Sequence, residues 1–318
     1  MVSRHRLWAL TLGLSACAAP SGAELTAPSL PLPEDPGERA LATRPLAENP
    51  FVWRVRCPNR PGWGFLLGSI HVRRKNATEL PLPIGALVDA VDAVAFEAEE
   101  PGFWALLRDL YQLGGFGFLT RTELDEATWT ALETRLAPSK LKRGVLAHFA
   151  PWALTLLVLG VDMAESDLSP DTGIESLVKK RAEARSEPAS FLYMESAKSQ
   201  IQLFADLPES EQLELLRESL AAPPAGPDEL LDLYEAQDFL GLRTLSEASF
   251  EGSPEWRERI LDRRNRAFER FTWDLYGRRG TSLVVAGAAH MVGDLGVPAL
   301  LSGRGCLVEQ GRAVEKSP

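Results

Sequence analysis

The stretch that decides the fold is FLLGSIH, residues 65–71, in which an apolar run leads into the pattern Gly-x-x-His. The same pattern, an apolar run followed by Gly-x-x-His, recurs near the other end of the chain as LVVAGAAH, residues 283–290. Apolar runs of this length are typical of strands that are buried on both faces of a helix-covered sheet. A glycine just after such a strand lets the chain turn sharply, so that the histidine projects over the carboxyl edge of the sheet, where α/β proteins bind ligands. The repeat therefore predicts one site built from both ends of the chain.

Two more apolar runs end in a glutamate: AVAFE ends at Glu97 and FLYME ends at Glu195. We expect four strands to present His71, Glu97, Glu195 and His290 at one edge of the sheet. Two imidazoles with one or two carboxylates suit zinc, manganese, cobalt or ferrous iron better than calcium, and open coordination positions are what catalysis requires. The sequence predicts a divalent-metal site whose ligands are His71, His290 and one or both of the carboxylates, Glu97 first.

Each of these residues also has an ordinary structural explanation. Either histidine could simply be a buried side chain paired with a backbone carbonyl. Glu97 could become solvated where its strand ends, and Glu195 could be a favourable first-turn residue of a helix. His148, in LAHFAPW, has no repeated context, and we expect it to be structural.

The segments between the strands show helical spacing, so the expected fold is a single α/β domain: a mostly buried central sheet, helices on its faces and a large helical insertion. The expected helices are residues 103–113, 126–136, 146–159, 207–221, 228–240 and 253–277. On the last helix Asn265 falls on the apolar face, beside Arg264. Asparagine is costly to bury unpaired, so Asn265 should have a partner, either in the packing of the helix or at the site.

The first 16 residues are expected to be an export signal, with a basic start and the short apolar run Leu7 to Leu14. The following LSAC resembles the bacterial lipobox, whose cysteine, here Cys17, becomes the lipidated first residue. An ordinary signal peptide cut near Ala18 is the alternative. A lipidated Cys17 would anchor the protein to a membrane of the bacterial cell envelope without spanning it, facing the periplasm or the exterior.

Residues 17–50 are expected to be a tether, because seven prolines and few aromatic residues cannot form a core. Residues 51–311 form the expected domain, and residues 312–318 a polar tail. Removal of residues 1–16 changes the formal net charge from −10 to −12, which argues against nucleic acid as a partner. The oligomeric state is open.

Two cysteines remain, Cys57 and Cys306, each at the border of an expected strand. They could form a disulfide if those strands, residues 52–56 and 307–309, are neighbours. Two buried free thiols are the alternative.

Taken in order, the motifs resemble the TraB/GumN family over nearly all of residues 51–311. The resemblance rests on FLLGSIHV (65–72), PLP (81–83), AVAFE (93–97), GIESL (173–177), YMES (193–196) with Gln200, RN (264–265) and VAGAAHMVG (285–293). The family includes the Tiki proteases, which depend on manganese or cobalt, and is related to erythromycin esterases and to haem-binding lipoproteins.

The resemblance implies an α/β core whose two Gly-x-x-His motifs and a glutamate form the active centre. His71, Glu97 and His290 match those positions directly. Glu195, Arg264 and Asn265 match recurrent family positions and are the further catalytic candidates. Two residues depart from the family pattern: Glu175 stands where aspartate is common, and Ala289 where glycine is common.

The expected function is therefore that of a metal-dependent hydrolase, a peptidase acting on a peptide or protein, with manganese, cobalt or zinc as the metal. Glu97 would be a ligand or the general base, and Glu195 the base if Glu97 is a ligand. A non-catalytic lipoprotein that binds haem or a metal is the alternative. A third hypothesis is a vestigial site in a domain that interacts with other envelope proteins.

Overall fold

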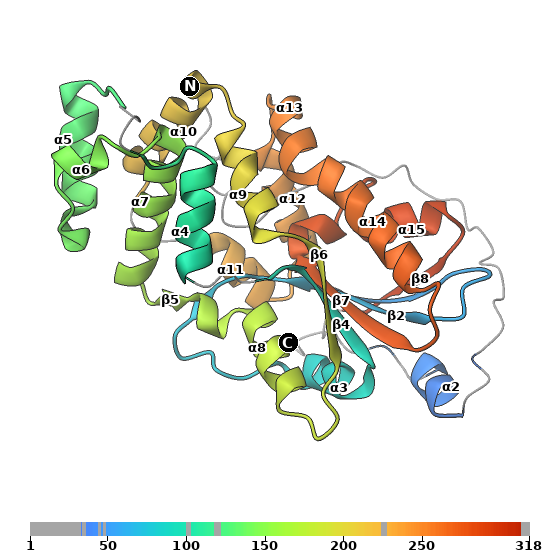
Figure 1. The fold of residues 1–318 in the computed structure, drawn as a ribbon. Coiled ribbons are helices and arrows are strands. Elements are labelled where there is room, and N and C mark those ends of the chain that lie inside the picture. The colour runs from blue at the N-terminus through green and yellow to red at the C-terminus, as the bar shows by residue number, and fades with distance from the viewer. Residues whose placement is uncertain are drawn as a thin grey trace, which may run out of the picture. The chain divides into compact units, whose positions relative to one another are not determined.

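A six-stranded sheet in the order β6-β4-β7-β2-β1-β8 forms the centre of the fold (Figure 1). Its strands are β1 (Val52–Arg56), β2 (Trp63–Ser69), β4 (Ala93–Ala98), β6 (Ser190–Glu195), β7 (Thr281–Gly287) and β8 (Leu307–Gln310). β7 is parallel to both β2 and β4, and β1 is antiparallel to β2 and β8. The four strands expected to carry site residues are thus consecutive in the sheet, and the predicted α/β fold is confirmed.

The computed structural model describes residues 33, 36–43, 46, 49–99, 103–117, 122–223 and 228–312. The expected signal segment, Cys17 and most of the expected tether lie outside these residues, as does most of the polar tail. Packing divides the described chain into two units. A sheet unit contains the residues up to 97, 170–194 and those from 229 onward, and a helical unit contains 98–169 and 195–228.

In the sheet unit, every residue of β2 and β7 is buried, as continuous apolar runs predict. β6 is only partly buried because it lies at the edge of the sheet. Helices α14 and α15 lie on one side of the sheet and α3 and α8 on the other (Figure 1). The remaining elements of the unit, with these helices, are α2 (Pro36–Thr43), β3 (Arg73–Arg74), α3 (Leu82–Ala90), η2 (Pro170–Thr172), α8 (Ile174–Glu183), α11 (Asp228–Glu235), α12 (Phe239–Ser249), α13 (Pro254–Arg257), the π-helix η3 (Glu258–Asp262), α14 (Arg263–Leu275), η4 (Ala288–Met291) and α15 (Val297–Gly303).

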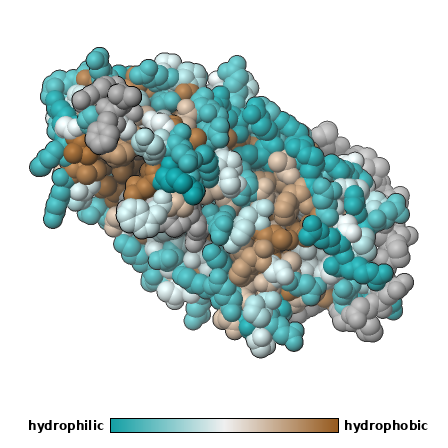
Figure 2. Space-filling view, viewed as in Figure 1, coloured by the Kyte–Doolittle hydropathy of each residue, from teal (hydrophilic) through white to brown (hydrophobic). Residues whose placement is uncertain are grey.

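The helical unit is the predicted insertion. It contains α4 (Phe103–Gln112), α5 (Glu126–Arg135), η1 (Ala137–Ser139), α6 (Arg143–Leu146), α7 (Pro151–Glu165), β5 (Leu168–Ser169), α9 (Ala197–Ala205) and α10 (Glu209–Ala221). Its core is formed by Trp129, Leu132, Leu136, Leu146, Leu154, Val158 and Leu216. On the face shown in Figure 2, hydrophobic residues also gather at the surface of this unit. On α4, Trp104 and Tyr111 are exposed.

Several helix boundaries differ from the prediction. The helix expected over residues 146–159 begins only at Pro151 and continues to Glu165 as α7, because a proline that cannot donate a backbone hydrogen bond favours the first turn of a helix. The helix expected over residues 228–240 ends at Glu235, near Gln237 with its positive φ of 58°, and α12 follows. The helix expected from Ser253 contains a π-helical segment immediately before α14.

Part of the expected tether is also helical, since α2 covers residues 36–43. Proline is absent between Pro36 and Pro45, and the alanines, leucine, glutamate and arginine of this segment are good helix formers. Ala42 is buried, so this turn of helix packs on other residues and does not fold alone.

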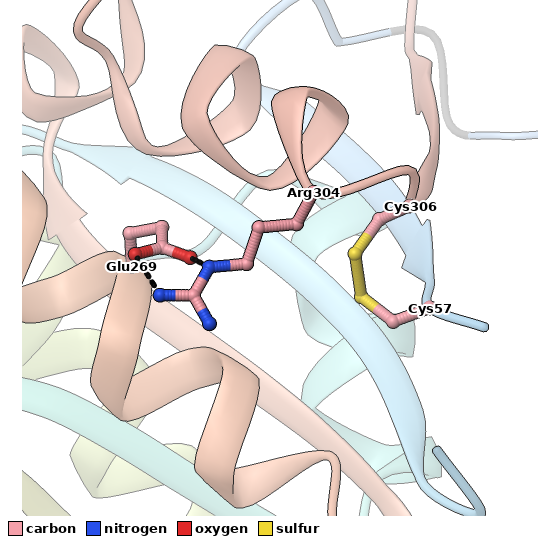
Figure 3. The surroundings of a disulfide bond; sticks show 4 residues. All are labelled: Cys57, Glu269, Arg304 and Cys306. Atoms are coloured by element: carbon pink, nitrogen blue, oxygen red, sulfur yellow. Dashed lines mark hydrogen bonds and ion pairs between the residues drawn. A yellow bond between two sulfur atoms is a disulfide. The ribbon is translucent and has the colours of Figure 1, made fainter. Parts of the chain in front are cut away.

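β1 and β8 are neighbours in the sheet, and Arg56 of β1 is paired with Leu307 of β8. Cys57 follows Arg56 and Cys306 precedes Leu307, and the two cysteines form a disulfide (Figure 3). The free-thiol alternative is therefore wrong. Beside the disulfide, Arg304 forms an ion pair with Glu269 of α14. Among the described residues, no helix combines the length and the apolar character needed to cross a bilayer.

Candidate functional site

Both Gly-x-x-His motifs lie where the parallel strands β2 and β7 end. Ser69 of β2 is level with Gly287 of β7 in the register of the sheet, so the two motifs leave at the same edge. Neither glycine has a positive φ, so neither is required for a left-handed backbone conformation. A Cβ on Gly68 would lie 3.1 Å from the Cα of Ala288. Gly68 thus allows close packing of η4 on β2, and no turn occurs at this glycine because β2 continues to Ser69, whereas η4 begins directly after Gly287.

His290 is fully buried, and its ring is held in one orientation. Its Nδ1 lies within hydrogen-bond distance of Asn265 Oδ1, while Asn265 Nδ2 donates to the Leu295 carbonyl at 2.9 Å. Because this amide oxygen can only accept, the proton of the ring lies on Nδ1 and a lone pair on Nε2. Among the described residues Nε2 has no hydrogen-bond partner. Burial lowers the pKa of His290 to about 3, so the ring is neutral at neutral pH.

Glu97 ends the buried part of β4 beside His290. Its Oε1 accepts from the Gly287 N–H at 2.5 Å and lies 3.7 Å from His290 Nε2. Its Oε2 accepts from Arg264 Nη2 at 2.7 Å. Burial alone would raise the pKa of Glu97, but the neighbouring imidazoles, the Arg264 guanidinium and the Gly287 N–H together hold it well below its usual range. Glu97 is therefore a carboxylate.

His71 is paired with a carboxylate rather than with an amide. Its Nδ1 lies 3.1 Å from Oε2 of Glu175, and Ser69 Oγ donates to Oε1 of the same side chain at 2.8 Å. The negative charge of Glu175 raises the pKa of His71 to about 9, against the effect of burial. Ser69 is buried and directs its proton to Glu175, so this serine is not arranged as a nucleophile activated by a histidine.

His71, Glu97 and Glu175 form one cluster, in which one potential ligand atom from each lies within 4.8 Å of the others. It is the one such group found in the part of the chain that the structure describes. The predicted ligands His71 and Glu97 are thus brought together, and Glu175, to which the sequence assigned no role, joins them. His290 lies outside this group but beside Glu97.

The other predicted residues are placed as follows. Arg264, beside Glu97, also donates from Nη1 to the Ile260 carbonyl of the π-helix at 3.1 Å. Glu195 is the last residue of β6 and belongs to the helical unit, where Gln200 Nε2 donates to its Oε1 at 2.9 Å. His148, also in the helical unit, has its Nδ1 3.3 Å from the Gly117 carbonyl.

Three residues near the first motif were not found from the sequence: Ser69, Glu175 and Tyr234. Tyr234 is buried, and its hydroxyl donates to the Gly68 carbonyl at 2.7 Å. Burial raises the pKa of Tyr234, so the hydroxyl keeps its proton. Ser69 and Glu175 both lie in quoted motifs, but their contact joins positions 106 residues apart, and the sequence carried no signal for it.

Comparison with known proteins identifies the family to which the chain belongs. No curated protein and no solved structure gives a significant match to the chain. The model of the TraB/PrgY/gumN family matches residues 51–310, which covers both Gly-x-x-His motifs and all the residues of the cluster. The chain belongs to the TraB/PrgY/gumN family.

Proposed function

We propose that the protein is a metal-dependent hydrolase of the bacterial envelope that acts on a peptide or protein. The observation that supports this best is Nε2 of His290, a buried acceptor without a hydrogen-bond partner among the described residues, 3.7 Å from a carboxylate oxygen. A buried acceptor left without a partner costs about 1–3 kcal/mol. A divalent cation at this edge of the sheet would remove that cost.

The chemistry of the predicted donor set suits such a cation. His71, His290 and Glu97 are the residues that would hold it, and their nitrogen and oxygen donors suit manganese, cobalt or zinc. A bound divalent cation supplies Lewis-acid chemistry, because it polarises a carbonyl and makes water more acidic.

The surrounding residues favour separate roles for the two candidate carboxylates. Glu97 has a strongly lowered pKa and is therefore a poor proton acceptor near neutral pH, which supports the role of ligand over that of general base. If Glu97 is a ligand, Glu195 is the residue that the sequence proposes as the base. The Arg264 guanidinium keeps Glu97 ionised, and we propose that its positive charge also stabilises negative charge that develops on a carbonyl oxygen.

Metal binding is tested on the full chain, purified without a chelating column. We expect bound manganese, cobalt or zinc in the wild type, and loss of binding in His71→Ala and in His290→Ala, measured by titration calorimetry, with an unchanged circular dichroism spectrum. His148→Ala is the matched control, because His148 lies outside both Gly-x-x-His motifs and its Nδ1 is paired with the Gly117 carbonyl. Undiminished binding in either site variant would contradict a shared site. A haem absorption spectrum would instead support the non-catalytic lipoprotein.

Catalysis is tested on Glu97→Gln and Glu195→Gln side by side. If Glu97 is a ligand and Glu195 the base, the first variant loses metal affinity, while the second keeps the metal and loses peptide cleavage. Full activity in both variants would refute the carboxylate part of the proposal.

A further inference from the structure

The first turn of α8 is fixed against the first Gly-x-x-His motif by the backbone. The Ile174 N–H donates to the Ile70 carbonyl at 3.0 Å. Gly173 packs so closely that a Cβ at this position would lie 2.2 Å from the His71 carbonyl oxygen. Glu175, the second residue of α8, is therefore held beside His71 by main-chain packing, and the start of a helix favours its negative charge.

Both carboxylate oxygens of Glu175 are engaged by the motif itself. Ser69 Oγ donates to Oε1, and His71 Nδ1 lies at hydrogen-bond distance from Oε2. A carboxylate held in this way fixes the ring of a histidine through Nδ1 and presents Nε2, which binds a cation once the cation displaces its proton.

The second motif uses the same arrangement with neutral groups. His290 Nδ1 is paired with Asn265, and Asn265 is held by the Leu295 carbonyl. In both motifs the histidine is fixed through Nδ1 by a side chain that a third group holds in place. The parallel indicates that Glu175 does for His71 what Asn265 does for His290.

We propose that Glu175 is a positioning residue, which together with Ser69 orients His71 for cation binding and is not itself a ligand. The proposal rests on the proposed function, because it concerns the same metal site. It differs from the simplest interpretation of the three-residue cluster, in which the Glu175 carboxylate would bind the cation directly.

A glutamine at position 175 separates the two roles. Its amide oxygen can accept from His71 and its amide nitrogen can donate to Ser69 Oγ, so that both hydrogen bonds are kept while the negative charge is lost. Manganese and cobalt affinities are measured by titration calorimetry on the full chain. We expect Glu175→Ala to weaken binding about 10–100-fold, as is typical when the partner of a ligating histidine is removed, Ser69→Ala to weaken it less, and Glu175→Gln to recover most of the loss.

Glu183→Ala is the matched control, because Glu183 is an exposed residue of the same helix. This variant should bind manganese and cobalt with the affinity of the wild type. The visible spectrum of bound cobalt should be the same in Glu175→Gln and in the wild type, since the ligands are unchanged. Glu175→Gln binding as weakly as Glu175→Ala, or a changed cobalt spectrum, would make Glu175 a direct ligand. Wild-type affinity in Glu175→Ala would show that Glu175 has no role.

A second measurement does not depend on the metal. In the metal-free protein the Nδ1 proton of His71 should give a slowly exchanging NMR signal in the wild type and in Glu175→Gln. This signal should be absent from Glu175→Ala. If the wild type binds no metal, the proposed function fails, while this signal still decides whether Glu175 orients His71. Absence of the signal from the wild type would overturn the positioning role.

Discussion

Asn265 shows how a polar side chain can be accommodated in the interior of a helix. It has no exposed surface, and asparagine is a poor residue for a helix interior. Both ends of its amide are nonetheless used, the oxygen for His290 and the nitrogen for the Leu295 carbonyl. It follows the π-helical segment of residues 258–262, and such segments are frequent at functional sites. The burial of Asn265 is thus tied to the orientation of His290.

We expect Asn265→Ala to weaken metal binding about 10–100-fold, because the ring of His290 loses the group that fixes it. The same change should lower the free energy of unfolding by about 1–3 kcal/mol, since a buried N–H is left without an acceptor. Titration calorimetry and urea unfolding measure the two effects. Thr272→Ala is the matched control, because Thr272 is equally buried in α14 but its hydroxyl donates to the Phe268 carbonyl of its own helix. Equal metal affinity in the wild type and Asn265→Ala would contradict the assigned role.

The site was predictable to the extent that it consists of repeated local patterns. His71 and His290 share a motif, Glu97 ends an apolar run, and Asn265 breaks an apolar face. The partner of His71 could not be predicted in this way, because Glu175 follows no apolar run and reaches Ser69 only through the packing of α8. Local patterns thus reveal side chains at strand ends but not which helix covers them.

At the scale of the elements, the strands were easier to predict than the helix ends. A strand buried on both faces needs a continuous apolar run, which is visible in the sequence for β2, β4 and β7. Helix ends depend on single residues and on packing, as Pro151 and Gln237 show. The joining of α14 to the end of α15 by Glu269 and Arg304 likewise appears only in the folded chain (Figure 3).

This ion pair leads to a prediction about pH. Burial raises the pKa of Glu269 above its ordinary 4.5, although Arg304 and Arg270 oppose the shift. A carboxyl group whose pKa is raised in the folded state favours folding when protonated, and this contribution is lost as pH rises from 4.5 through the folded-state pKa. Arg304→Ala removes the positive charge that compensates the Glu269 carboxylate. It should therefore lower the free energy of unfolding by about 2 kcal/mol at neutral pH, and by less near pH 4, where Glu269 is protonated more often.

Urea unfolding at the two pH values measures this difference. The double variant Arg304→Ala with Glu269→Gln is the control, because it removes the buried charge as well and should regain stability at neutral pH. An equal loss at both pH values would mean that Arg304 stabilises the fold through its contact with the ring of Trp273 and not through Glu269.

At the scale of the whole molecule, we propose that Cys17 carries a lipid that holds the domain at a membrane of the envelope. The LSAC sequence at residues 14–17 supports this, and the disulfide between Cys57 and Cys306 fits an oxidising compartment outside the cytosol. Residues 17–50, if fully extended, could reach about 100 Å, and α2 within them shortens that reach. A hydrolase on such a tether would act on substrates close to the membrane.

Cys17→Ser tests the anchor, because a serine hydroxyl cannot replace the thiol to which the lipid is attached. We expect the wild type in the membrane fraction of the producing bacterium and the variant in the soluble periplasmic fraction, with mass spectrometry showing the lipid on the wild type alone. Cys57→Ser is the matched control, since it removes a cysteine from the domain and should leave the protein lipidated at the membrane. A Cys17→Ser protein that stays wholly with the membranes would contradict the anchor and would point to a protein partner that holds the domain there.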